Sequence, residues 1–185
     1  MLATDRLVLH PYTLDDLPHL ATLLGDEETM ATMGGPLDSS GARSWLECNL
    51  ARYERDGYGR YAITLRDTGA FVGDCGLIVT NVEGAEEREL GWIVDRAFRG
   101  QGIATEAALA WRDRAFGELG LRRFVSIVEE PNVASRRVAQ KIGMTVERRV
   151  IWGEDDLHGR PYLMYATRSD GEPREGGSRG PAPIA

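Results

Sequence analysis

The sequence predicts a mixed α/β fold, in which about four helices flank a mostly antiparallel sheet of six or seven strands. Two periodicities and one turn support this prediction. Apolar and polar side chains alternate over seven short segments, as in half-buried strands, and apolar residues recur at helical spacing over four longer segments. Between two of the strands, residues 99–102 form a glycine-bearing turn that opens a helix, which is typical of a parallel strand–helix–strand unit.

In the first half of the chain, polar caps and turns separate the periodic segments. Thr13 precedes a run of regularly spaced leucines and predicts a helix start, and Ser39 or Ser40 caps a second helix that Gly57 ends. The turn at 67–69 joins its two flanking strands into a hairpin. The expected elements here are a strand at 6–11, helices at 13–24 and 39–56, strands at 61–66, 70–79 and 88–95, and an acidic turn at 81–87.

The second half begins with the helix that the glycine turn opens, whose inner face carries Ala107 and Trp111. Gly143 fits the C′ position of a later short helix. The expected elements here are a helix at 101–119, a strand at 122–129, a helix at 133–142 and strands at 145–152 and 162–167. We therefore expect a single domain at 1–167. The Gly, Pro, Ser and charged residues of 168–185 predict a flexible tail.

Composition narrows the classes of partner. The 185 residues, 42% hydrophobic and 28% charged, suffice for one buried core, and the net charge of −7 weighs against nucleic acid. No apolar run approaches the roughly 18 residues of a membrane span, and no secretory signal pattern is present. The 2 cysteines and 3 histidines have no metal-ligand spacing. We expect a cytoplasmic protein without metal, nucleic-acid or membrane partners.

Residues 89–105 carry the main functional indication, because a glycine turn there follows a strand and opens a helix. The first N–H groups of a helix lack internal partners and lie at its positive end, while glycines let an anion approach the backbone. We therefore expect a phosphate-bearing ligand at this turn. A P-loop is excluded because no lysine follows the glycines. A dinucleotide fold is a less favoured alternative, because Thr105 stands where the third glycine belongs and other strands precede the turn.

Several blocks around this turn resemble the GNAT superfamily of N-acetyltransferases, in particular its RimJ/RimL-type branch. The matching blocks are Arg99-x-x-Gly102-x-Ala104, which is similar to the acetyl-CoA signature Arg/Gln-x-x-Gly-x-Gly/Ala, the preceding Glu89-Leu-Gly-Trp92, the following Asn132-x-x-Ser135-x-x-Val138-x-x-Lys141-x-Gly143-Met144, and the opening Asp5-Arg-Leu-Val-Leu-His-Pro11 with Leu14-Asp-Asp16. The resemblance covers about residues 4–167. His10 departs from it, because this branch usually carries arginine there.

The resemblance implies a sheet whose central strands splay apart to admit acetyl-CoA as cosubstrate. It also implies transfer of the acetyl group to a primary amine by direct attack. In the family, strand backbone groups bind pantetheine, the glycine turn cradles the pyrophosphate, and an asparagine is a second anchor beside the pantetheine. The implied cofactor-binding residues are Trp92, Ile93, Val94, Arg99, Gly100, Gln101, Gly102, Ile103, Ala104 and Asn132. Simple N-capping of the next helix is an alternative for Asn132, and the two roles are compatible.

Direct attack requires a base for the amine and a group that assists the leaving thiolate. Glu89 is the candidate base. It shares a strand face with Gly91 and Ile93, and burial there would raise its pKa so that it acts through a bridging water. Ser135 is the candidate for protonating the thiolate or hydrogen-bonding its sulfur. The alternatives are a solvated edge carboxylate for Glu89 and a locally satisfied first-turn serine for Ser135.

The expected acceptor is a protein N-terminus or a small cationic amine, bound to a monomer or a homodimer. Acidic clusters at 26–28 and 154–156 fall where the family places its acceptor-side loops and would steer a cation, although solvated loop charge is an alternative. Two other functions stay open. One is a non-catalytic CoA-binding sensor or partner module, and the other is a transferase that uses a longer acyl-CoA.

Overall fold

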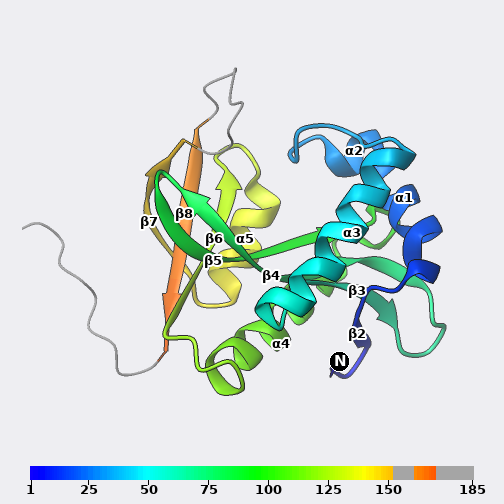
Figure 1. Ribbon diagram of the computed structural model, residues 1–185. Coiled ribbons are helices and arrows are strands. Elements are labelled where there is room, and N and C mark those ends of the chain that lie inside the picture. The colour runs from blue at the N-terminus through cyan, green and yellow to red at the C-terminus, as the bar shows by residue number, and fades with distance from the viewer. Residues whose placement is uncertain (152–160, 170–185) are drawn as a thin grey trace, which may run out of the picture.

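A computed structural model describes residues 1–151 and 161–169 (Figure 1). The strands of these residues form one eight-stranded sheet in the order β1-β2-β3-β4-β5-β6-β8-β7. Strands β5 and β6 pair in parallel, and every other neighbouring pair of this described sheet is antiparallel. The strands are β1 (Leu2–Ala3), β2 (Leu7–Pro11), β3 (Arg60–Leu65), β4 (Phe71–Val82), β5 (Ala85–Val94), β6 (Arg123–Glu129), β7 (Thr145–Val150) and β8 (Tyr162–Arg168).

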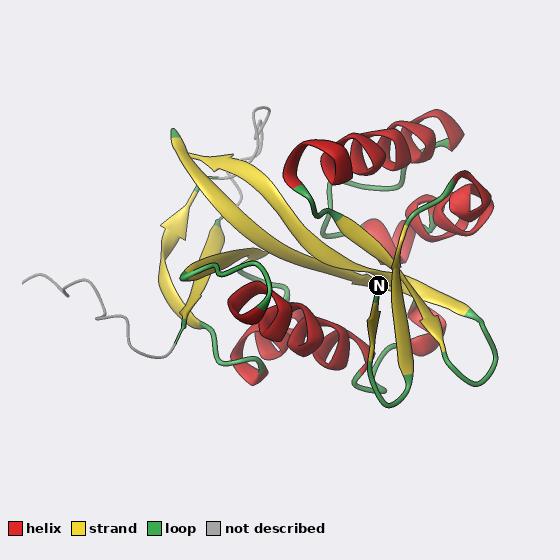
Figure 2. Cartoon of the chain, turned by 60° about the horizontal axis from the view of Figure 1, so that its bottom comes forward, coloured by secondary structure: helices red, strands yellow, loops and turns green. Residues whose placement is uncertain are grey.

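Helices cover both faces of the sheet, as Figures 1 and 2 show. One face packs against α4 and α5 through a core that includes Trp111 and Leu90, and the other packs against α1 to α3 through a core that includes Leu46 and Ile93. Full burial of each such side chain stabilises the fold by about 1.5–3 kcal/mol. The helices are η1 (Leu14–Asp16), α1 (Leu17–Gly25), α2 (Glu27–Met30), α3 (Ser39–Asp56), η2 (Arg96–Phe98), α4 (Ile103–Gly117) and α5 (Val133–Lys141).

The predicted fold class is confirmed, with differences at element ends. Strand β1 and helix α2 were not expected, because segments of 2 and 4 residues are too short to show a periodicity. Helix α4 begins at Ile103 and not at 101, because Gly102 has a left-handed φ of +82° and serves as the N-cap. The cap of α3 is Asp38, whose carboxylate accepts a hydrogen bond from the Gly41 N–H at 2.8 Å, and not Ser39 or Ser40.

The acidic turn predicted at 81–87 is present but much shorter in the structure. Strands β4 and β5 continue through most of this segment and are joined by Glu83 and Gly84 alone. These two residues have φ values of +52° and +89°, and two successive positive φ values suit the tight turn of a twisted hairpin.

The end of the chain differs from the prediction in two described residues, Arg168 and Ser169. The Ser169 N–H donates a hydrogen bond to the Arg122 carbonyl oxygen at 3.0 Å. Arg168, expected to begin the tail, pairs with Arg123 in the sheet, so the last strand extends past 167. The expected loop at 153–159, the end of the strand at 152 and the rest of the tail from 170 lie outside the described residues.

The central strands β5 and β6 separate after a single paired position. Glu89 pairs with Val125, and the next link is a side-chain bond, in which the Ser126 hydroxyl donates to the Leu90 carbonyl oxygen at 2.6 Å. Beyond it, β5 runs on to Val94 and β6 to Glu129 without further pairing between them. We call these two unpaired edges the splay. Ligands of sheets with parallel strands bind beyond such carboxyl ends.

Candidate functional site

The glycine turn at the end of β5 has the backbone geometry of an anion site. Gly100 and Gly102 have φ values of +76° and +82°, and a Cβ at Gly100 would point into open space. Helix α4 starts directly after Gly102, and no side chain of the described residues caps its first N–H groups. The positive end of a 15-residue helix is therefore open to a ligand.

Arg6, which directly precedes β2, supports this turn, and the sequence analysis missed it. Its Nη1 donates to the Gln101 carbonyl oxygen at 3.0 Å, and its Nη2 pairs with Glu106 at 2.6 Å. The same guanidinium lies 3.5 Å from the position that a Cβ on Gly102 would take. An arginine far away in the sequence therefore braces the turn, and its charge is paired with Glu106 of the first turn of α4.

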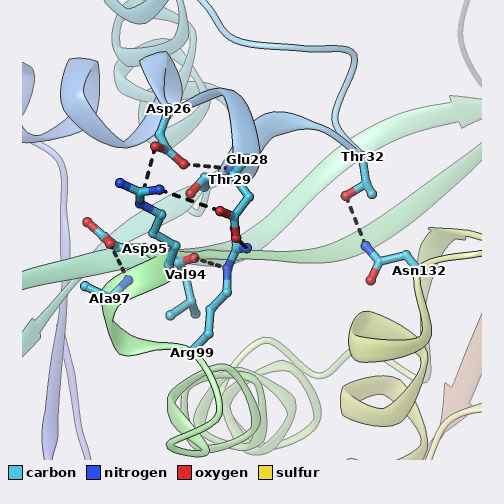
Figure 3. Close-up of polar contacts among 10 residues, drawn as sticks. Asp26, Glu28, Thr29, Thr32, Val94, Asp95, Ala97, Arg99 and Asn132 are labelled. Atoms are coloured by element: carbon cyan, nitrogen blue, oxygen red, sulfur yellow. Dashed lines mark hydrogen bonds and ion pairs between the residues drawn. The ribbon is translucent and has the colours of Figure 1, made fainter.

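Arg96 and Arg99 of the turn region pair with Glu28 of α2 and with Asp26, the N-cap of that helix. Figure 3 shows Arg99 beside Glu28. The Nη1 of Arg99 lies 3.1 Å from Glu28, and its Nε donates to the Val94 carbonyl oxygen at 3.3 Å. Arg96 lies 3.7 Å from Asp26 and 3.6 Å from Glu28. The carboxylates of Asp26 and Glu28 are thus matched by two arginines, which weakens the expectation that this cluster attracts a cationic amine. The second acidic cluster, 154–156, lies outside the described residues.

Asn132 stands at the end of β6, on the other side of the splay. Its Oδ1 accepts a hydrogen bond from the Ser135 N–H at 3.0 Å, so it does cap helix α5. Its Nδ2 donates to the Thr32 hydroxyl at 3.0 Å, as Figure 3 shows. Residues 26–32 therefore contact Arg99 of the glycine turn at one end and Asn132 at the other.

Ser135 lies in the first turn of α5 and meets β5 through its side chain. The indole Nε1 of Trp92 donates a hydrogen bond to the Ser135 Oγ at 3.3 Å. Trp92 packs at the edge of the core under α4 and α5, whereas Ile93 points to the α1–α3 face. The structure therefore brings Trp92, from the β5 side of the splay, against Ser135, which lies with Asn132 on the β6 side.

Glu89 occupies the last paired position of β5, where the splay begins. It is a partly buried residue of a central strand, so it is not an edge carboxylate. Burial raises the pKa of Glu89 to about 7, and the charge of Arg60 and the backbone N–H of Ile127 limit the rise, with a smaller contribution from Arg52. A carboxylate with this pKa is half ionised near neutral pH and can accept a proton from an amine.

A buried network beside Glu89 was also missed by the sequence analysis. Arg60, 4% exposed, forms an ion pair with the fully buried Asp74, which accepts a hydrogen bond from the Tyr12 hydroxyl at 2.7 Å. A Cβ on Gly91 would clash with the Arg60 guanidinium. The only sequence indication of this network was a glycine inside the strand, which often marks a close approach.

Three further observations concern the described residues. Within residues 1–151 and 161–169, no three or more His, Cys, Asp or Glu side chains gather in a way that could hold a metal ion. No helix of those ranges has the length and apolar character to cross a membrane. Cys75 is fully buried, and burial raises the pKa of its thiol, which disfavours the nucleophilic thiolate.

Comparisons with known proteins agree with the geometry. Residues 6–145 match a family model described as an acetyltransferase (GNAT) domain. YkkB of Bacillus subtilis strain 168 is 31% identical over 170 residues, which cover 91% of this chain and 95% of YkkB. YnaD, described as an N-acetyltransferase of the same strain, is 25% identical over 79% of this chain and 83% of its own.

Solved structures show the same fold. An acetyltransferase from Agrobacterium tumefaciens C58 superposes with a TM-score of 0.78 at 32% identity, covering 91% of this chain and 94% of its own. RimL, a ribosomal L7/L12 N-acetyltransferase solved with coenzyme A, has a TM-score of 0.75 at 20% identity, over 91% of this chain and 97% of its own. One structural neighbour of this chain was therefore solved with CoA bound.

Proposed function

The chain belongs to the GNAT family of N-acetyltransferases, and we propose that it transfers an acetyl group from acetyl-CoA to a primary amine by direct attack. The observation that carries the proposal is the splay. Its β5 edge begins at Glu89, whose pKa is raised, and leads to the start of α4, where no side chain of the described residues caps the first N–H groups. A protein N-terminus and a small amine both offer the primary amine that would accept the acetyl group.

The unpaired edge of β5 supports the binding of pantetheine, whose amide groups can pair with a strand edge. Because the Leu90 carbonyl faces β6, the alternation of strand backbone directs the N–H and C=O groups of Trp92 and Val94 to the same side. The Ile93 carbonyl instead lies against Gly73 of β4, so Ile93 contributes to the site through its side chain.

The turn from Arg99 to Ala104 supports the binding of the pyrophosphate. The N–H groups that follow Gly102 supply positive partial charge, and the glycines leave space for the phosphate oxygens. The Arg6 guanidinium, which is paired with Glu106, holds the Gln101 carbonyl oxygen of the turn in place. Arg99 contributes once Glu28 releases it, because Glu28 now holds the position of an anion. The Nδ2 of Asn132 would similarly exchange Thr32 for pantetheine while its Oδ1 still caps α5.

The protein groups divide the chemistry between the two sides of the splay. Acetyl-CoA supplies the activated acetyl group when bound. Glu89 accepts a proton from the amine, directly or through water, as the amine nitrogen bonds to the carbonyl carbon. Ser135 donates a hydrogen bond to the sulfur that takes the electron pair of the breaking C–S bond. The thiolate then takes a proton from Ser135 or from water, and Glu89 releases the proton of the amine to water, which restores any proton that Ser135 has given.

Thiol release from acetyl-CoA, measured across a panel of amines, tests the proposal. The panel contains peptides with free N-termini, the same peptides with blocked N-termini, polyamines and aminoglycosides. We expect release with at least one free amine and none with blocked peptides. Tight CoA binding without turnover of any amine would favour the sensor alternative, and no CoA binding in calorimetry would exclude the proposed site. Competition with longer acyl-CoA thioesters measures the preference for acetyl.

A further inference from the structure

The bond between Trp92 and Ser135 joins the two sides of the site. The indole N–H can only donate, so the Ser135 Oγ accepts in this bond. The Ser135 N–H is bound to Asn132 at 3.0 Å, so the backbone of the residue is also held. No described residue accepts a hydrogen bond from the Ser135 hydroxyl, which leaves its hydrogen available for a ligand.

We propose that Trp92 is a positioning residue, whose indole N–H orients the Ser135 hydroxyl so that its hydrogen is presented to the leaving sulfur. This inference rests on the proposed function of the site. A serine in the first turn of a helix otherwise rotates among three staggered positions and bonds to nearby backbone groups. An N–H donor on one side of the oxygen removes that freedom and favours donation on the other side.

The position of Trp92 gives this bond a second consequence. Trp92 lies on β5 within the splay, where its backbone groups face the side proposed for the pantetheine arm. The residue that holds the arm therefore also holds the hydroxyl that meets the sulfur at the end of the arm. This arrangement fixes the position of the sulfur relative to the Ser135 hydroxyl. Stabilisation of a developing charge requires donors that are already in place.

Substitution W92F tests the role of the N–H, because phenylalanine keeps an aromatic ring but cannot donate. We expect W92F to lower kcat about 10-fold, the effect of a hydrogen bond of about 1.4 kcal/mol, while the KM for acetyl-CoA changes less than about 2-fold. S135A should lower kcat by at least as much. In the double variant W92F/S135A, kcat should equal that of S135A, because the indole then has no hydroxyl to orient.

Trp111 provides the matched control, since its buried Nε1 has no hydrogen-bond partner among the described residues. W111F therefore removes an indole N–H without removing such a bond, and its kcat should stay within about 2-fold of the wild type. Thermal unfolding and CoA calorimetry of every variant separate a loss of packing from a loss of positioning. If Trp92 has only a structural role, W92F should lower Tm and leave kcat unchanged at temperatures where the protein is folded.

Three outcomes would overturn the inference. In the first, the fold-decreases in kcat of W92F and S135A multiply in the double variant. In the second, S135A retains full kcat. In the third, W92F raises the KM for acetyl-CoA without lowering kcat. In each case the wild type still acetylates its amine, so the proposed function stands. If the wild type binds CoA but releases no thiol with any amine, the proposed function fails first, and the positioning role fails with it.

Discussion

Replacing Glu89 by glutamine should abolish proton transfer and at the same time stabilise the folded protein above pH 7. The physical reason is the cost of holding an ionised carboxylate in the partly buried centre of the sheet. Burial raises the pKa of Glu89 from 4.5 to about 7 against the opposing charge of Arg60 and, more weakly, of Arg52. The folded chain therefore keeps a proton that the unfolded chain releases.

The sign and size of the effect follow from the two pKa values. Below pH 4.5 the carboxyl is protonated in both states, and its contribution to the free energy of unfolding is fully present. That contribution decreases as the pH rises and is lost above about pH 7. Each pH unit between the two values corresponds to about 1.4 kcal/mol, so the total is about 3 kcal/mol, of which about 2 kcal/mol is lost between pH 5.5 and pH 8.

Urea unfolding of the wild type and Glu89→Gln at pH 5.5 and pH 8 measures this quantity. The glutamine side chain does not titrate, and all other groups cancel in the difference between the two proteins at each pH. We expect the stability of Glu89→Gln relative to the wild type to rise by about 2 kcal/mol from pH 5.5 to pH 8. Glu54→Gln, at an exposed position of α3, is the control and should show no such rise.

A relative stability that is the same at both pH values would refute the reasoning, because Glu89 would then titrate alike in the folded and unfolded chains. The kinetic counterpart is an acidic limb in the pH profile of kcat/KM with a midpoint near 7, the pKa of Glu89. If the profile is flat from pH 6 to pH 8 in the wild type, Glu89 does not act as the base.

Three other substitutions test the surroundings of the site. Gly102→Val should weaken CoA binding in calorimetry at least about 10-fold, because a branched side chain at a φ of +82° strains the turn and fills the phosphate side; unchanged affinity would count against the turn. Glu28→Gln should tighten CoA binding about 2- to 5-fold at low salt, because exposed ion pairs of about 0.2–1 kcal/mol no longer hold Arg99, and weaker binding would show that Glu28 supports the site. Asp74→Asn should destabilise the protein by about 3–5 kcal/mol in urea unfolding, because it leaves the buried Arg60 charge without its carboxylate; a loss under about 1 kcal/mol would contradict the buried ion pair.

Local sequence patterns identified the elements because the residues that encode them are adjacent in the chain. The leucines of α1, the hairpin turn at 67–69 and the Gly143 terminus each act within a few residues, and their positions were predicted. The cap of α3 and the β4–β5 turn were misplaced, because several neighbouring residues have similar preferences and the register of the strands decides among them.

The glycine turn shows how far short-range reasoning reaches. Residues 99–104 predicted an anion site from backbone geometry alone, and the described turn has the required left-handed glycines and open helix start. The residues of the turn did not predict which charged side chains from other parts of the chain lie beside it. Arg6, just before β2, bonds to Gln101 of the turn across 95 positions of the chain, and Glu28 of α2 pairs with Arg99 across 71 positions.

The amino-acid sequence alone predicted most of the strands and helices in order and a candidate anion site at the glycine turn, because periodicity, caps and turns are local properties. Its resemblance to a known family supplied the chemistry for which Glu89 and Ser135 are the candidates. Tertiary packing was needed for everything that depends on distance through space. It placed Glu89 at the start of the splay with a pKa near 7, joined Trp92 to Ser135, and buried Arg60 against Asp74. Burial and charge act between side chains that come into contact only in the folded chain. A local sequence pattern does not show which distant residues those are.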